Sequence, residues 1–307
     1  MIALRIATRK SRLALWQAEH VKRRLEQMNP LLRAGLLPLQ TSGDELLGAA
    51  LAKAGGKGLF IKELEAALQD GRAELAVHSM KDVPVELPGP FTLAAILARD
   101  DPRDALVSNR YASLDELPPD AIIGTSSLRR ASQLKQRHPG FEIRMLRGNV
   151  DTRLAKLDRG ECAAVVLAAA GLKRLGLEQR IRAYLEVGAS VPAAGQGALG
   201  IECCAERADL LALVAPLQDP STAICVRVER AVNRALGGNC TIPLGAYAEL
   251  SGERIRLRAI VASPDGSRIA RADCEGAAAA PEALGERAAE ELRRRGATEI
   301  LSSLDQR

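Results

Sequence analysis

Short apolar runs alternate with amphipathic stretches along the first hundred residues. Four of these runs have the length and aliphatic content of buried strands, and they are residues 3–8, 34–40, 73–79 and 91–97. Residues 11–28 and 57–71 carry apolar side chains at helical spacing, with Ser11 as a candidate N-cap and Gly71 as a stop signal. The resulting order of strands and helices is typical of a parallel sheet covered by helices.

The same order returns in the next stretch of the chain, although the residues differ. Strand-like runs are found at residues 104–108, 121–127 and 141–146. Helical patterns occupy residues 128–138 and 149–161, the second closed by Gly160, and residues 162–177 are a strand that continues into a helix. We therefore expect a second sheet of the same kind.

The last third of the chain has a different pattern. Residues 191–203 are rich in glycine and small residues and end in an apolar strand, which we expect to cross back to the first half. A helix at 223–236, a hairpin at 255–274 around a Pro-Asp-Gly turn and a helix at 282–300 follow. These elements predict a small α+β domain.

The expected fold is α/β, with two lobes of mostly parallel sheet covered by helices on both faces, plus the small C-terminal α+β domain. The predicted boundaries are residues 1–97 with 197–216 for lobe 1, residues 98–196 for lobe 2 and residues 219–307 for the third domain. Clefts between lobes are favoured ligand sites, and we expect one here.

Composition narrows the function. Only 2% of the 307 residues are aromatic, which disfavours single-stranded nucleic acids as ligands because their bases stack on aromatic rings. The net charge of +5 fits either an acidic partner or an amino-acid composition that only reflects a GC-rich genome. No apolar run reaches the ~20 residues of a membrane span, and no signal peptide is evident, so we expect a cytoplasmic protein without a membrane partner.

Six cysteines without CxxC spacing and three scattered histidines argue against a zinc site or a disulfide framework. We therefore expect no metal. Among the cysteines, Cys240 is the best candidate for carrying a covalent group because it lies between "GGN" and "TIP", in a loop. The alternative is that it is a buried small apolar residue, as most lone cysteines are.

Arginines and hydroxyl residues follow several of the predicted strands. Ten arginines but only three lysines fall between residues 129 and 182. Loops after strands line the ligand crevice of an open α/β sheet, and an arginine fork binds both oxygens of a carboxylate. Phosphate-binding glycine motifs are missing. The pattern favours a ligand with several carboxylates over a phosphate, although each arginine taken singly is also compatible with a solvated surface position.

The stretch "AVHSMKDVPVE" places Asp82 just after a strand and beside Lys81. An ionised carboxylate in a cationic cleft can pair with a pyrrole-type N–H or a positive intermediate, and can move protons. The alternative is an ordinary turn residue.

Eight stretches together resemble the porphobilinogen deaminase (hydroxymethylbilane synthase) family, and they are "LRIATRKSRLALWQA", "GGKGLFIKELE", "AVHSMKDVP", "GTSSLRR", "LRGNVDTRL", "AGLKRLGL", "PAAGQGALGIE" and "GGNCTIPLG". The resemblance runs in order from residue 3 to beyond 245. It implies three domains, the first two similar to periplasmic binding proteins, and a monomer. It also implies that four porphobilinogen molecules are joined head to tail with loss of ammonia, on a dipyrromethane cofactor held by a cysteine thioether.

The resemblance also implies roles for particular residues. Cys240 would carry the cofactor and Asp82 would be catalytic. The implied cofactor-binding residues are Arg129, Arg130, Ser127, Lys81, Arg153 and Thr125. The implied substrate-binding residues are Arg9, Ser11, Arg147, Arg174 and Gln196. Two positions depart from the family pattern, namely Asn239 before the cysteine and Arg12 where proline is frequent.

Two other functions share part of this pattern. A non-catalytic two-lobed binding protein for an acidic solute would need the arginines but neither Asp82 nor Cys240. A regulator that binds nucleic acid would show binding that weakens steeply with salt. We expect porphobilinogen as the small-molecule partner and no nucleic acid.

Overall fold

The computed structural model describes residues 2–45, 61–238 and 242–305. The chain divides into two compact units. Unit 1 contains residues 1–100 and 198–223, and unit 2 contains residues 101–197 and 224–307. The division into three domains that we predicted from the sequence stays a prediction.

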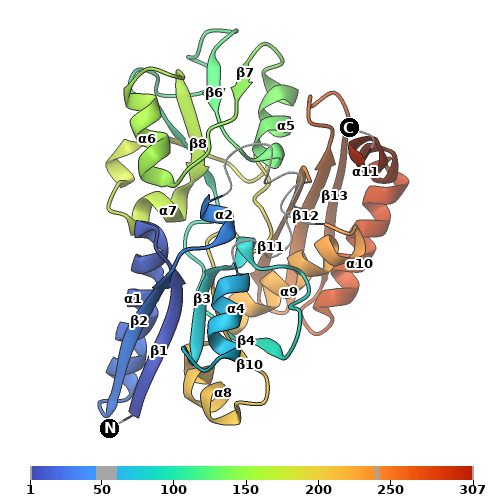
Figure 1. Ribbon diagram of the computed structural model, residues 1–307. Helices are drawn as coiled ribbons and strands as arrows, with labels where there is room; N and C mark the ends of the chain where they lie inside the picture. Colours follow the sequence, from blue (N-terminus) through green and yellow to red (C-terminus); the bar gives the residue numbers. More distant parts are fainter. Residues whose placement is uncertain (1, 46–60, 239–241, 306–307) are drawn as a thin grey trace. The chain divides into compact units, whose positions relative to one another are not determined.

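Unit 1 is built on a five-stranded sheet with the order β2-β1-β3-β10-β4 (Figure 1). Its strands are β1 (Ile2–Arg9), β2 (Leu32–Leu39), β3 (Leu75–Ser79), β4 (Phe91–Ile96) and β10 (Leu199–Cys204). β1 is parallel to β2 and β3, whereas β10 runs antiparallel to both β3 and β4. The predicted return of the chain to the first half is therefore confirmed.

Helices cover both faces of this sheet. Ile6 and Ala7 are consecutive in β1 and so point to opposite faces. Ile6 packs in one core cluster with the buried side of α1 (Arg12–Met28), and Ala7 packs in another with α4 (Lys62–Gln69). The remaining helical elements of the unit are α2 (Ser42–Glu45), η1 (Met80–Asp82), α8 (Ala208–Val214) and η3 (Ala215–Leu217).

The sheet of unit 2 repeats this topology with the order β7-β6-β8-β5-β9. Its strands are β5 (Asp104–Val107), β6 (Ile122–Gly124), β7 (Glu142–Arg144), β8 (Ala164–Ala168) and β9 (Ile181–Leu185). β6 is parallel to β7 and β8, and β5 is antiparallel to β8 and β9. The helical elements between them are α5 (Leu128–Arg137), α6 (Val150–Asp158), α7 (Ala169–Arg174) and η2 (Glu178–Arg180).

Unit 2 also contains an antiparallel sheet of β11 (Leu244–Ser251), β12 (Arg254–Ala262) and β13 (Ile269–Ala277). One face packs on α9 (Pro220–Ala235), α10 (Pro281–Arg294) and α11 (Ala297–Asp305). The prediction of a single helix over 282–300 is wrong, because Gly296 takes a φ of +94° and ends α10. The predicted fold class is confirmed: two mostly parallel α/β sheets and a small α+β part.

Candidate active site

A pocket opens in unit 1 where β1 and β3 reach their carboxyl ends. These strands are parallel neighbours, so the residues that follow them lie at the same edge of the sheet. The polar residues that line the pocket are Arg9, Ser11, Gln17, His78, Ser79 and Asp82. The apolar ones are Leu13, Ala14, Ile61 and Val77. Three predicted site residues, Arg9, Ser11 and Asp82, are therefore brought together.

A helix cap and a side-chain hydrogen bond hold the residues of this pocket in position. Ser11 is the N-cap of α1, as predicted, and its Oγ accepts a hydrogen bond from the backbone N–H of Ala14 at 3.3 Å. The cap starts the helix two residues after Arg9, the last residue of β1. Gln17 Nε2 donates to Ser79 Oγ at 2.8 Å, which links α1 to the end of β3.

Asp82 belongs to the single 3₁₀ turn η1 that follows β3. Its side chain is half-buried, as is that of Lys81 on the same turn. Met80 is buried beneath the turn, and its backbone N–H donates to the carbonyl of Ala198 at 3.0 Å. Lys81 is not among the described residues that line the pocket, so only the carboxylate of this pair is placed there.

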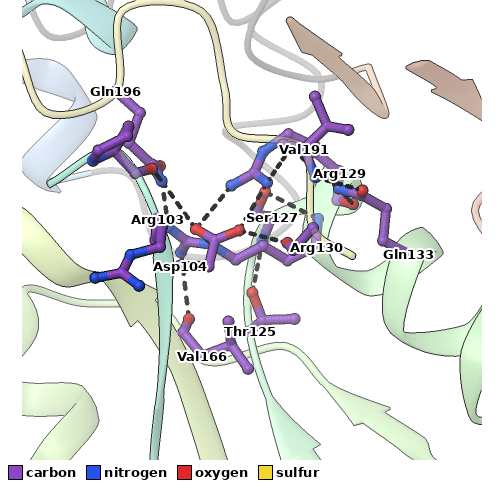
Figure 2. Close-up of polar contacts among 12 residues, drawn as sticks. Arg103, Asp104, Thr125, Ser127, Arg129, Arg130, Gln133, Val166, Val191 and Gln196 are labelled. Atoms are coloured by element: carbon purple, nitrogen blue, oxygen red, sulfur yellow. Dashed lines mark hydrogen bonds and ion pairs between the residues drawn. The ribbon is translucent and has the colours of Figure 1, made fainter. Parts of the chain in front are cut away.

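In unit 2, four side chains donate hydrogen bonds to the carboxylate of Asp104, and three of them, Arg129, Arg130 and Gln196, are labelled in Figure 2. Arg129 donates with both ends of its fork, from Nη1 to Oδ2 at 2.8 Å and from Nη2 to Oδ1 at 3.1 Å. Arg130 Nε and Gln196 Nε2 donate to Oδ1 at 2.8 and 3.0 Å, and Ser190 Oγ donates to Oδ2 at 2.8 Å. We call these five residues the Asp104 cluster. Three predicted site residues thus meet around a carboxylate of the chain itself.

Burial makes this cluster electrostatically strong. Asp104 is fully buried, and the side chains of Arg129 and Arg130 are only 4% and 6% exposed. Burial alone would raise the pKa of Asp104, but the charges of both arginines and their hydrogen bonds outweigh it and hold the pKa far below its usual range. Asp104 is therefore ionised at any physiological pH.

Backbone carbonyls occupy further donors of the two arginines. Arg129 Nη1 also donates to the carbonyl of Val191 at 2.7 Å, and Arg130 Nη1 donates to that of Val166 at 3.2 Å (Figure 2). Gln133 accepts from the N–H of Val191 at 2.7 Å and so holds the same segment. The hydrogen bonds to β8 and to the segment around Val191 therefore fix the direction of both guanidinium groups.

The stretch "GTSSLRR" forms the predicted strand-to-helix turn between β6 and α5. Thr125 is buried, and its Oγ1 accepts from the N–H of Ser127 at 3.2 Å. Ser127 is the N-cap of α5 and accepts from the N–H of Arg130 at 3.4 Å. Cap and turn together place both arginines in the first turn of the helix.

The three remaining predicted arginines lie elsewhere in unit 2: Arg147 in the turn before α6, Arg153 in α6 and Arg174 at the end of α7. Arg153 Nε donates to the carbonyl of Gly148 at 2.9 Å and so folds back onto the turn that carries Arg147. Arg147 is half-buried, and its buried Nε has no hydrogen-bond partner among the described residues. Arg174 Nη2 donates to the carbonyl of Gly197 at 2.5 Å, beside the Asp104 cluster.

Cys240 lies outside the described residues. Of the other cysteines, Cys162, Cys203 and Cys225 are buried, whereas Cys204 and Cys274 are half-buried. Burial raises the pKa of the Cys203 thiol to about 11 and also raises the pKa of Cys162, Cys204 and Cys274. These four thiols are therefore poor sources of a thiolate.

Sequence reasoning missed Asp104, Gln17 and His78 as site residues. Asp104 begins an apolar run, where a charge is unusual, and that was the one available signal. Its partners lie 25 or more positions away along the chain, so only the fold shows the contact. Gln17 and His78 sit within apolar patterns that predicted a helix and a strand, and each is buried.

Among the described residues, no helix has the length and apolar character needed to cross a membrane. The same part of the chain brings together no three His, Cys, Asp or Glu side chains in an arrangement suited to a metal ion.

Comparison with known proteins gives two family matches. Residues 4–212 match the model described as "Porphobilinogen deaminase, dipyromethane cofactor binding domain", and residues 223–294 match "Porphobilinogen deaminase, C-terminal domain". A curated porphobilinogen deaminase from Bordetella parapertussis is 59% identical over 301 residues, which cover 98% of this chain and 96% of that protein. One from Burkholderia thailandensis is 58% identical over 304 residues, covering 98% and 92%.

Two solved structures have similar folds at low sequence identity. The methionine-binding protein MetQ matches with a TM-score of 0.47 and 12% identity, covering 72% of this chain and 92% of that one. A periplasmic substrate-binding protein of an ABC transporter from Coxiella burnetii matches with a TM-score of 0.46 and 13% identity, covering 73% and 94%.

Proposed function

Since this chain belongs to the porphobilinogen deaminase family, we propose that it joins four porphobilinogen molecules head to tail, releasing one ammonia at each addition. Water then frees hydroxymethylbilane. The dipyrromethane cofactor for which the family domain is named supplies, when bound, the pyrrole end from which the product grows. One observation carries the proposal: a guanidinium group, from Arg9, and a carboxylate, from Asp82, line the same pocket.

Arg9 binds the substrate. Porphobilinogen carries an acetate and a propionate group, and an arginine fork binds a carboxylate through two parallel hydrogen bonds. The hydroxyl of Ser11 lies in the same pocket and supplies a further polar contact. Both residues follow β1, so the strand sets their spacing.

Asp82 performs the chemical role. Its carboxylate accepts a hydrogen bond from a pyrrole N–H and stabilises the azafulvene cation that forms from the substrate as ammonia leaves. A half-buried carboxylate is suited to this, since its field acts on the developing charge with less screening than in water. The apolar part of the pocket keeps water away from the cation.

The residues of unit 2 fit an acidic pyrrole cofactor. Four carboxylates on two pyrrole rings need several cationic donors, which Arg129, Arg130 and Arg153 would supply. The buried Nε of Arg147, which has no hydrogen-bond partner among the described residues, is left for a substrate carboxylate. Arg147 and Arg174 bind substrate carboxylates, with Gln196. The residues that would hold the cofactor are Arg129, Arg130, Arg153, Thr125, Ser127 and Lys81. Asp104 keeps the two forks of the Asp104 cluster fixed and charged.

Four finer assignments belong to the same proposal. Cys240 carries the cofactor through a thioether, which is not cleaved when the product leaves. The protein works as a monomer in the cytoplasm, with residues 1–97 and 197–216, 98–196 and 219–307 as its three domains. The 92–96% of each relative covered by the matches supports the proposal that one chain holds the whole activity.

The mass of the intact purified chain tests the proposal. The wild-type chain should exceed its sequence mass by two condensed pyrrole units, and the Cys240→Ser variant should not. A wild-type chain at its bare sequence mass that also fails to consume porphobilinogen would refute the proposal.

Two sets of variants test the residue roles. Asp82→Ala should keep the added mass while turnover collapses, because the carboxylate acts on the reaction rather than on attachment. Arg129→Leu, Arg130→Leu and Arg153→Leu should each reduce the fraction of chains with the added mass or stop chain growth, because carboxylates left unpaired in a buried site are costly. Normal turnover in all four variants would remove these residues from the mechanism.

A further inference from the structure

Three buried titratable side chains lie behind the pocket of unit 1. His78 Nε2 is 2.7 Å from Glu202 Oε2, and the two side chains are 4% and 0% exposed. Glu65 is 6% exposed, and its carboxyl group interacts electrostatically with both. We call these residues the His78 cluster. The mechanism above uses none of them.

Three elements of one unit hold this cluster. His78 is the last residue but one of β3 and lies opposite Gly200 of β10, so Glu202 is two positions further along the same strand. Glu65 lies on the buried side of α4. His78 alone of the three also lines the pocket that contains Asp82 and Arg9.

The buried carboxyl groups of the His78 cluster differ from Asp104 in their hydrogen-bond partners. The carboxylate of Asp104 accepts hydrogen bonds from four side chains, as a structural buried charge usually does. Among the described residues, both oxygens of Glu202, one oxygen of Glu65 and Nε2 of His78 have no hydrogen-bond partner, although Glu202 Oε2 lies only 2.7 Å from that Nε2. Unsatisfied buried carboxylates beside an imidazole are typical of functional sites rather than of structural ones.

The charges of the cluster suit proton exchange. Burial and, to a smaller extent, the nearby charge of Glu202 raise the pKa of Glu65 to about 7, against the opposing effect of His78 and Lys62. Glu65 therefore holds a proton below about pH 7. Because Nε2 faces Glu202, Nδ1 is the ring nitrogen left for a proton from the pocket.

We propose that His78 accepts the proton released at each coupling step and that Glu202 is the positioning residue that orients its ring, an inference that rests on the proposed function. The C–N bond of porphobilinogen breaks and its electron pair leaves with ammonia. A pair from the acceptor pyrrole forms the new C–C bond. The C–H bond at that pyrrole carbon then breaks, its pair restores the aromatic ring, and the proton passes to the imidazole. A carboxylate that orients an imidazole in this way is a recurring base arrangement.

A kinetic isotope effect tests this step. Porphobilinogen deuterated at its free α-carbon is compared with unlabelled substrate in the wild type, Glu202→Gln and His78→Gln. Loss of a general base typically slows a reaction by about 10²–10⁴-fold, so both variants should lower kcat with little change in KM. Proton removal should then limit the rate, and the isotope effect should rise well above the wild-type value.

Glu229→Gln is the matched control, since Glu229 is also fully buried but accepts hydrogen bonds from Gly195 and Ala248 in unit 2. Its isotope effect should equal that of the wild type, whatever its stability. The isosteric Glu65→Gln variant adds a second readout: we expect an inflection near pH 7 in the wild-type profile of kcat/KM and none in that of the variant.

The outcomes separate the two proposals. A wild type with neither added mass nor turnover means that the proposed function fails. An active wild type, combined with an unchanged isotope effect in both Glu202→Gln and His78→Gln, overturns the role of the His78 cluster alone. A fall in kcat of folded Glu202→Gln without a rise in the isotope effect would show that Glu202 acts only in packing, and would overturn it too.

Discussion

Asp104→Asn should destabilise unit 2 severely. The change keeps the shape of the side chain, but it removes the negative charge that pairs with two buried guanidinium groups. It also replaces an acceptor oxygen with an NH₂ group that points at donors from Arg129, Arg130 or Ser190. Two cations then remain in a site that excludes water.

The magnitude follows from the burial. Removing one partner of a buried ion pair typically costs about 3–5 kcal/mol, because the other charge stays buried without compensation. For a domain of this size, 1 kcal/mol shifts the melting temperature by about 2–4 °C, so we expect a fall of about 6–20 °C. Circular dichroism during heating measures it directly.

A matched surface pair provides the control. Asp158 accepts from Arg180 at 2.6 Å, with its side chain 49% exposed. Asp158→Asn should cost less than about 1 kcal/mol because solvent screens the pair. If Asp104→Asn melted within a degree or two of Asp158→Asn, the reasoning that the Asp104 cluster is a buried and strongly coupled site would be refuted.

Three further predictions concern pH, packing and capping. Because the pKa of Glu65 rises from an ordinary 4.5 to about 7 on folding, its contribution to stability is full below about pH 4.5 and is lost as pH rises through 7. Each pKa unit is worth about 1.4 kcal/mol. The free energy of unfolding of Glu65→Gln, measured with urea, should therefore rise by roughly 3 kcal/mol relative to that of the wild type between pH 5 and 8. Parallel curves of unfolding free energy against pH would contradict this. A Cβ at Gly285 would lie 2.5 Å from Ala231 Cβ and 2.6 Å from the carbonyl of Val228, so Gly285→Ala should cost about 1–3 kcal/mol by overpacking α9 against α10, again measured by urea unfolding. Ser11→Ala should cost about 0.5–2 kcal/mol through the lost N-cap, whereas an unchanged melting temperature would mean that the cap contributes nothing.

Local signals in the sequence predicted much of the fold. Ser11 starts α1 as its cap predicts, and Gly266 takes a φ of +71° in the hairpin turn where Pro-Asp-Gly predicted it. The apolar strand after the glycine-rich stretch was also expected to return to the first half, and β10 does so.

Weakly patterned elements were missed. β9 is an edge strand with a mostly half-buried "IRAYL" sequence, and β11 has the sequence "LGAYAELS", in which small residues interrupt the large apolar ones. Neither has the continuous apolar run of a buried strand, so periodicity alone did not separate them from loops. The break at Gly296 was missed because a glycine within a helical pattern is often tolerated.

Contacts at the candidate site depend on long-range pairing. The sequence predicts that Arg129 and Arg130 bind carboxylates of a ligand. Their partner in the structure is Asp104, and the role toward a ligand stays a prediction. The 2.7 Å contact between His78 and Glu202 joins residues 124 positions apart, which only the antiparallel pairing of β3 and β10 brings together. No local pattern carries such information.

The insertion of β10 between β3 and β4 has a consequence for synthesis on the ribosome. Within the described residues, β4 pairs with β10, and β10 is made about a hundred residues after it. At a translation rate of about 5–20 residues per second, β3 and β4 each keep one edge unpaired for roughly 5–20 s until β10 is made. Open edges recruit other chains, so a fragment that stops before residue 199 should aggregate, and cells that produce this protein rapidly should depend on chaperones that shield nascent β-edges.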